Sequence, residues 1–113
     1  MGEKQILADK STFETILDIV SSVAEVSSEE ILSKSKVAEV VDARHIVVQL
    51  LSEQGWYQSR IARKMSIGEG AVSRMLSKFD ERCQYRGFYI NKVLEKSRKI
   101  IREGFAKPLS KHC

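Results

Sequence analysis

The chain has 113 residues, a formal net charge of +4 and 42% hydrophobic residues, which suits one domain with a single core and leaves no room for a separate catalytic domain. The positive balance favours a polyanionic partner, either nucleic acid or an anionic membrane surface. No apolar run approaches the roughly 20 residues that a membrane-spanning helix needs, and residues 1–10 lack the apolar core of a secretion signal, so we expect a cytoplasmic protein.

Residues 11–25 have the pattern of an amphipathic helix. Ser11 and Glu14 have the spacing of a capping box, in which a serine and a glutamate satisfy the first backbone N–H groups of a helix. Apolar residues then recur at helical intervals, at Phe13, Ile16, Leu17, Val20, Val23 and Ala24. We therefore predict a helix that begins at Ser11 and follows a flexible segment, residues 1–10.

A shorter helix and a basic loop are predicted next. Residues 27–30, SSEE, combine a residue type favoured at the N-cap with acidic residues for the first turn, and Ile31 with Leu32 supplies an apolar pair. The following residues, Ser33, Lys34, Ser35 and Lys36, form what we call the basic loop. Their polar character and the lack of helical period predict an exposed connection.

A longer helix is predicted from about Val37 to Gln54. Its apolar residues keep a helical period and are Val40, Ala43, Ile46, Val47, Leu50 and Leu51. Gly55 stands directly after it, where glycine commonly ends a helix. We expect this helix to form the centre of the core.

The segment 57–79, YQSRIARKMSIGEGAVSRMLSKF, predicts two short helices joined by a tight turn. Its apolar residues fit two helical faces that meet at a bend: Ile61, Ala62, Met65, Ile67, Val72, Met75, Leu76 and Phe79. Ser66 and Glu69 have capping-box spacing, which would begin the second helix and leave Gly68 to shape the turn. The arrangement is typical of a helix-turn-helix, whose second helix enters the major groove of DNA.

With the apolar face inward, the remaining residues of the second helix are candidate contacts to bases and phosphates: Gly68, Glu69, Gly70, Ala71, Ser73, Arg74, Ser77 and Lys78. Small side chains at the front of this helix would let its backbone approach the groove. Arg74 can offer a bidentate fork to guanine or a phosphate, and Lys78 suits a phosphate. Arg60 and Arg63, from the preceding helix, are candidates for the flanking backbone.

Four cations at four-residue steps strengthen this interpretation: Arg74, Lys78, Arg82 and Arg86. We expect the second helix to continue to about Gln84. Between residues 58 and 86 seven cations stand against three acids. A plain helical hairpin with solvated outer residues, or a protein-binding adaptor, is the simpler interpretation. Neither gives a reason for the aligned cations, so we expect binding to double-stranded DNA.

After the helix-turn-helix Gly87 interrupts the pattern, and apolar residues predict a final helix that stops before Pro108: Phe88, Ile90, Val93, Leu94, Ile100, Ile101 and Phe105. The whole chain is therefore expected to be all-α, a bundle of about six helices. Cys83 and Cys113 are too few for a metal cluster or a disulfide framework. His45 and His112 are far apart and no carboxylate pair stands out, so we expect no enzyme, no metal and no cofactor.

Residues 26 to about 94 resemble the carboxy-terminal DNA-binding domain of the bacterial replication initiator DnaA. The string EEILSKSKVAEVVDARHIVVQLLSEQG is similar to that family's short helix, basic loop and long helix, followed at once by the helix-turn-helix. The resemblance implies a Trp-repressor-like fold, sequence-specific binding of origin DNA and a nucleoid-associated location. It implies that Lys34 or Lys36 reaches the minor groove, and that Arg44 and His45 contact phosphates. The initiator family also carries an ATPase module, but this sequence has no G-x-x-x-x-G-K-[ST] loop, so we expect no nucleotide hydrolysis here. The resemblance leaves two possibilities, a free-standing relative or a piece of a longer chain that carries the ATPase module.

The second helix departs from the family pattern. Where the family has Asp-His-Thr-Thr-Val, this chain has GEGAV, with Val72 in register. The family's base-contacting side chains are therefore missing, and recognition of the initiator's own box sequence is not expected. The alternative is a Trp-repressor-like transcriptional regulator, which would form a homodimer through residues 11–25 or 88–105. In either case we expect residues 95–113 to form a terminal helix and a tail.

Overall fold

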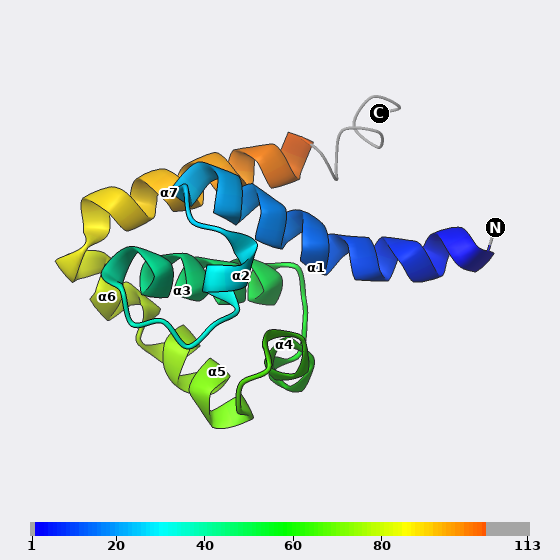
Figure 1. The fold of residues 1–113 in the computed structure, drawn as a ribbon, viewed down its shortest axis with the longest axis horizontal. Coiled ribbons are helices and arrows are strands. Elements are labelled where there is room, and N and C mark those ends of the chain that lie inside the picture. Colours follow the sequence, from blue (N-terminus) through cyan, green and yellow to red (C-terminus); the bar gives the residue numbers. More distant parts are fainter. Residues whose placement is uncertain (1, 104–113) are drawn as a thin grey trace.

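Seven α-helices and no strand make up residues 2–103, the part of the chain that the computed structural model describes, with side chains described from Thr12 onward. The helices are α1 (Gly2–Ala24), α2 (Ser28–Ile31), α3 (Ala38–Glu53), α4 (Gln58–Met65), α5 (Glu69–Ser77), α6 (Phe79–Tyr85) and α7 (Gly87–Ile101), and Figure 1 shows their arrangement. The predicted all-α bundle of about six helices is confirmed. Within residues 2–103 no helix has the length and apolar character to cross a bilayer.

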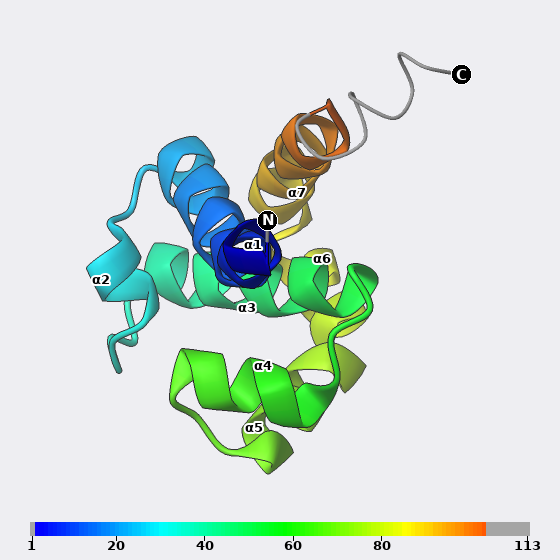
Figure 2. The same ribbon diagram turned by 90° about the vertical axis from the view of Figure 1, so that its right-hand side faces the viewer.

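The central helix is α3, as predicted. It contacts α1, α2, α4, α5 and α7, and Figure 2 shows it between α1 and α7 on one side and α4 and α5 on the other. All six apolar residues predicted to face inward are buried, and Val48 is buried as well. A helix that is apolar over most of its circumference is stable only when other helices cover it on several sides, which explains its central place.

Helix α1 begins at Gly2, so the start predicted at Ser11 is wrong. Residues 2–10 contain strong helix formers and no proline, so nothing in the sequence ends the helix upstream of Ser11. The apolar face is confirmed, since Phe13, Ile16, Leu17, Val20 and Ala24 are all buried. The first turns of α1 extend beyond the other helices (Figure 1).

The short helix and the ends of the long one follow the predicted local chemistry. The Ser27 hydroxyl accepts from the Glu30 N–H at 3.1 Å, and the Glu30 carboxylate accepts from the Ser27 N–H at 3.2 Å, so a capping box starts α2. Helix α3 ends before Gly55, whose φ of +89° is a left-handed conformation that glycine adopts without strain. The chain then turns into α4.

The turn between α4 and α5 differs from the prediction. Ser66 has φ 59° and ψ 43° and ends α4 in the left-handed region, while Gly68 is the N-cap of α5 without a side-chain cap. The predicted capping box of Ser66 and Glu69 is therefore wrong, because Ser66 lies two residues before the N-cap and Glu69 is the first residue of α5. Gly68 has an ordinary φ of −77°, so it is Ser66 that gives the turn its left-handed residue.

The second helix is also shorter than predicted. It ends at Ser77, and α6 starts at Phe79 after a bend at Lys78, where φ is −103° and ψ is 10°. Phe79 is buried, so the bend turns this ring into the core. In α7, four of the six described apolar residues are buried as predicted, but Phe88 and Ile100 are exposed. Phe105 and Pro108 lie outside the described residues.

Candidate nucleic-acid interface

One side of α5 packs inward and the other is exposed. Val72 is fully buried, and Ile67, Met75 and Leu76 pack against the same core. Most of the predicted contact residues of this segment are exposed, namely Gly68, Glu69, Gly70, Ser73, Arg74, Ser77 and Lys78, while Ala71 is half-buried. The helix contacts α3, α4 and α6. The local pattern therefore placed the exposed face of α5 correctly.

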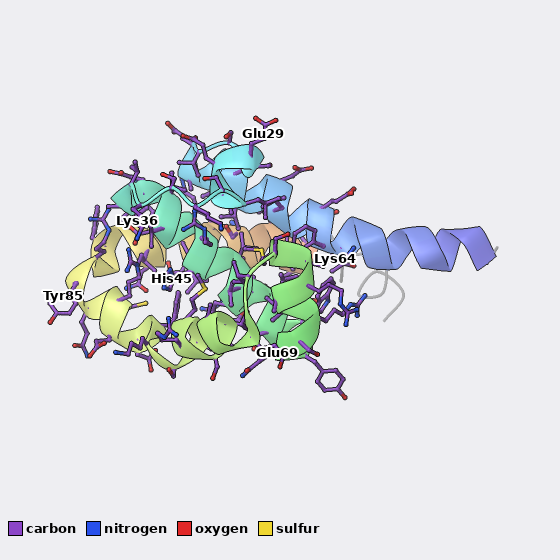
Figure 3. The ribbon with its side chains drawn as sticks, turned by 60° about the horizontal axis from the view of Figure 1, so that its bottom comes forward. Glu29, Lys36, His45, Lys64, Glu69 and Tyr85 are labelled. Atoms are coloured by element: carbon purple, nitrogen blue, oxygen red, sulfur yellow. The ribbon has the colours of Figure 1, made fainter. Side chains whose placement is uncertain are left out.

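Beside this face lies a groove between the basic loop, the start of α3, and α5 with α6. It measures about 930 Å³ and we call it the basic groove. Its lining includes seven cations and one carboxylate: Lys34, Lys36, Arg44, Arg74, Lys78, Arg82, Arg86 and Glu81. Figure 3 shows His45 between Lys36 of the loop and α6, with Tyr85 at the outer end of α6. Such a surface concentrates positive potential on one face.

The basic groove continues toward the helix-turn-helix. A smaller hollow of about 540 Å³ joins Ser33, Lys34 and Arg44 to the turn residues Ser66, Ile67 and Gly68, with Ala71 and Met75 between them. The two hollows share Lys34, Arg44, Ala71 and Met75. A single extended ligand could therefore contact the basic loop, α5 and α6 at once.

Arg44 does not have the role that the sequence suggested. It is 9% exposed, and its guanidinium donates to the carbonyl oxygens of Ile31 at 2.8 Å, Ser33 at 2.7 Å, Ser35 at 3.2 Å and Glu30 at 3.3 Å. These bonds use all three guanidinium nitrogens, so Arg44 is not the freely exposed cation that the resemblance implied. Arg44 instead holds the backbone of α2 and the basic loop against α3.

The basic loop is ordered by its own serines as well. Ser33 donates through its hydroxyl to the Glu30 carbonyl at 2.6 Å, and its oxygen accepts from the Ser35 N–H at 3.1 Å. The Ser35 hydroxyl in turn accepts from the Val37 N–H at 3.2 Å. Lys34 and Lys36 are exposed. The loop therefore presents two lysines from a backbone that is already fixed.

His45 is half-buried in the basic groove. Its Nδ1 lies 2.9 Å from the Val41 carbonyl, so Nδ1 carries the proton and donates. Burial lowers the pKa of His45 below its usual value, and the Arg82 and Arg44 charges lower this pKa further, against the raising effects of the Val41 hydrogen bond and the Asp42 charge. At neutral pH the neutral imidazole therefore predominates.

This lowered pKa predicts a pH-dependent stability. At pH values between the folded-state pKa of His45 and its ordinary value of 6.5, the unfolded chain binds more protons than the folded chain. The free energy of unfolding should therefore fall as the pH drops from 7 through 6. Urea unfolding at pH 7.5, 6.5 and 5.5 measures this slope. His45→Gln should flatten it, and an identical slope in both proteins would contradict the assignment to His45.

The cations of α4 are divided between packing and solvent. The Arg60 guanidinium carbon lies 3.9 Å from the centroid of the Trp56 ring, and Trp56 packs against Phe13 with ring centroids 6.3 Å apart. Arg60 thus covers the indole with its cationic face, a contact that the sequence did not reveal. Arg63 is exposed, and Tyr57, next to Trp56, is 81% exposed.

Arg82 and Arg86 have a structural partner that the sequence analysis missed. Asp42 is completely buried, and it accepts from Arg82 Nε at 2.7 Å and from Arg86 Nε through its other oxygen. The two cations therefore do not continue a solvated stripe along one helix. The signal that could have indicated a buried ion pair was the position of Asp42, between Val41 and Ala43 and next to the buried face of the predicted helix.

Metal-ligating side chains do not gather in groups of three or more anywhere in the described part of the chain. Cys83 is a free, half-buried thiol, and burial raises its pKa, which favours the protonated form. Cys113 and His112 lie outside the described residues.

The site as a whole is a cationic groove built from three separate segments, flanked by the exposed face of a short helix. Its donors are guanidinium and ammonium groups, which bind phosphate oxygens well. Helix α5, beside the groove, packs against the core through the apolar residues of its opposite face. Comparison of the chain with known protein families, with curated proteins and with solved structures found no match in any of the three.

Proposed function

We propose that this chain binds double-stranded DNA through the helix-turn-helix of α4 and α5, as the DnaA domain that it resembles does. One observation carries the proposal: cations from the basic loop, α5 and α6 line a single groove beside the exposed face of α5. Double-stranded DNA carries a negative charge about every 1.7 Å along its axis, so a continuous cationic groove matches it in sign and extent.

In the proposed complex α5 enters the major groove with Gly68 and Gly70 foremost. A side-chain carbon at either position would meet no atom of the protein within 4 Å, so the fold leaves this end of the helix open to close approach. The DNA backbone then passes along the basic groove, between α5 and the basic loop. Lys34 and Lys36 lie on the far side of that backbone, toward the next minor groove.

Phosphates should supply most of the affinity. The front of α5 has few side chains that can bind a base edge, and Arg74, with a guanidinium suited to guanine, is the strongest candidate. If about five cations engage, the logarithm of the binding constant should fall with the logarithm of salt with a slope of roughly −4 to −5. A fluorescence titration with duplexes of random sequence measures this slope. Failure to form a complex at about 50 mM salt would rule the proposal out.

Two substitutions on α5 separate base contacts from backbone contacts. Arg74→Ala should cost on the order of 1 to 3 kcal/mol on a selected duplex and relax the preference at one base pair. Lys78→Gln should weaken binding alike on all duplexes and reduce the salt slope by about 0.9. Lys96→Gln removes the same charge from α7, beside a different hollow, and serves as the control. A uniform loss for Arg74→Ala would make Arg74 a backbone contact.

A further inference from the structure

Arg82 and Arg86 share a geometry that the pairing with Asp42 alone does not require. Each uses Nε for its hydrogen bond to the buried carboxylate. Within the described part of the chain, the Nη1 and Nη2 atoms of both guanidinium groups have no hydrogen-bond partner. Each arginine is thus held by its inner nitrogen while the two outer nitrogens keep their protons available.

The outer nitrogens are accessible from the basic groove. The side chains of Arg82 and Arg86 are 28% and 35% exposed, whereas Asp42 is fully buried beneath them. Both arginines line the basic groove. The Arg86 guanidinium also lies near the Tyr89 ring, whose centroid is 5.8 Å from the guanidinium carbon. The buried carboxylate therefore orients two cationic groups toward one open space.

We propose that Arg82 and Arg86 form a phosphate clamp, oriented by Asp42, that binds a backbone phosphate of the DNA beyond the helix-turn-helix. This inference rests on the proposed function. An arginine fork can donate two parallel hydrogen bonds to phosphate oxygens, and such charge-assisted bonds are the strong ones. Because the two side chains are already fixed by Asp42, little conformational entropy is lost when the phosphate binds.

The clamp lies past the bend at Lys78, with Arg82 in α6 and Arg86 between α6 and α7, so it cannot follow α5 into the major groove. It should contact the sugar-phosphate backbone and contribute no sequence preference of its own. Among the described residues that line the groove, Glu81 is the one carboxylate, and it disfavours a densely charged small anion there. A long polymer can engage the clamp and the basic loop together, because the groove is continuous between them. The occupant is therefore a phosphate of duplex DNA.

The first test uses the unmodified protein. Phenylglyoxal reacts with accessible guanidinium groups, and mass spectrometry of peptides reports the extent at each arginine. A saturating 25-base-pair duplex should slow modification of Arg82 and Arg86 several-fold. Arg98, which pairs with Glu53 at the other end of α3, is the internal control and should be unaffected. The clamp would be overturned if the duplex did not slow modification of Arg82 and Arg86. It would also be overturned if inorganic triphosphate, added without DNA, slowed their modification to the same extent.

The second test uses Arg86→Gln, since the glutamine amide can still donate to Asp42. Its affinity should fall about three- to tenfold on every duplex, with the salt slope reduced by about 0.9, while Arg98→Gln binds as the unmodified protein does. Unchanged affinity in Arg86→Gln refutes the clamp and leaves the proposed function standing. Absence of any duplex complex with the unmodified protein refutes both. Should Arg86→Gln fail to fold by circular dichroism, the protection experiment decides.

Discussion

Replacing Arg44 by alanine is expected to lower the free energy of unfolding by about 3 kcal/mol, because four carbonyl oxygens lose a charged donor and the buried space stays unfilled. Arg44→Lys should recover only a small part of this loss, since a single ammonium group cannot reach oxygens of four residues. Urea unfolding followed by circular dichroism measures both values.

The same substitution tests how the basic loop acts. Without Arg44 the basic loop should detach from α3. The loss of DNA affinity should then be larger than the loss expected from removing one phosphate contact. The double variant Lys34→Gln and Lys36→Gln is the matched comparison, because it removes the loop's charges at exposed positions and should leave stability unchanged. If Arg44→Ala leaves stability intact and weakens DNA binding by a single contact, Arg44 is a phosphate contact after all.

The helices of this fold follow largely from local sequence. The apolar period of residues 37–54 predicts a helix on its own, and the glycine at position 55 ends it through a backbone conformation. The capping box of Ser27 and Glu30 is likewise complete within four residues. These features depend on neighbours along the chain, so spacing alone is sufficient to predict them.

The turn of the helix-turn-helix shows where spacing fails. Ser66 and Glu69 have the interval of a capping box, but the same serine can end the preceding helix in the left-handed conformation. The choice depends on how Ile67 packs between the two helices. Packing is a property of the assembled core, so the local pattern could not decide between the two positions.

The groove could be predicted even less completely. Asp42 and its partners are separated by 40 and 44 residues, and helical spacing carries no information over that distance. The sequence predicts Arg82 and Arg86 only as members of a run of cations at four-residue steps, and Arg44 as a cation near the start of another helix. Their different roles appear only when α3 and α6 are brought together, because a buried carboxylate selects which cations pair with it.

Asp42→Ala is the second substitution expected to have a large effect. It removes the buried acceptor of two cations, so Arg82 and Arg86 must turn into solvent and α6 loses its polar contact with α3. Removing one partner of a buried pair usually costs 3 to 5 kcal/mol. The two arginines remain partly exposed and can be rehydrated, so we expect a smaller loss of about 2 kcal/mol. Thermal unfolding at neutral pH measures it, and an unchanged Tm would contradict the structural role of this carboxylate.

Asp42→Asn then separates charge from orientation in DNA binding. The substitution removes a negative charge beside the basic groove, so simple Coulomb attraction predicts tighter binding to DNA. It also places an amide group where one Nε donor needs an acceptor, so at least one arginine loses its fixed direction. If Arg82 and Arg86 act as an oriented clamp, affinity should fall by roughly tenfold despite the added positive charge. Tighter binding by the folded Asp42→Asn protein would show that the two arginines act only as diffuse charge.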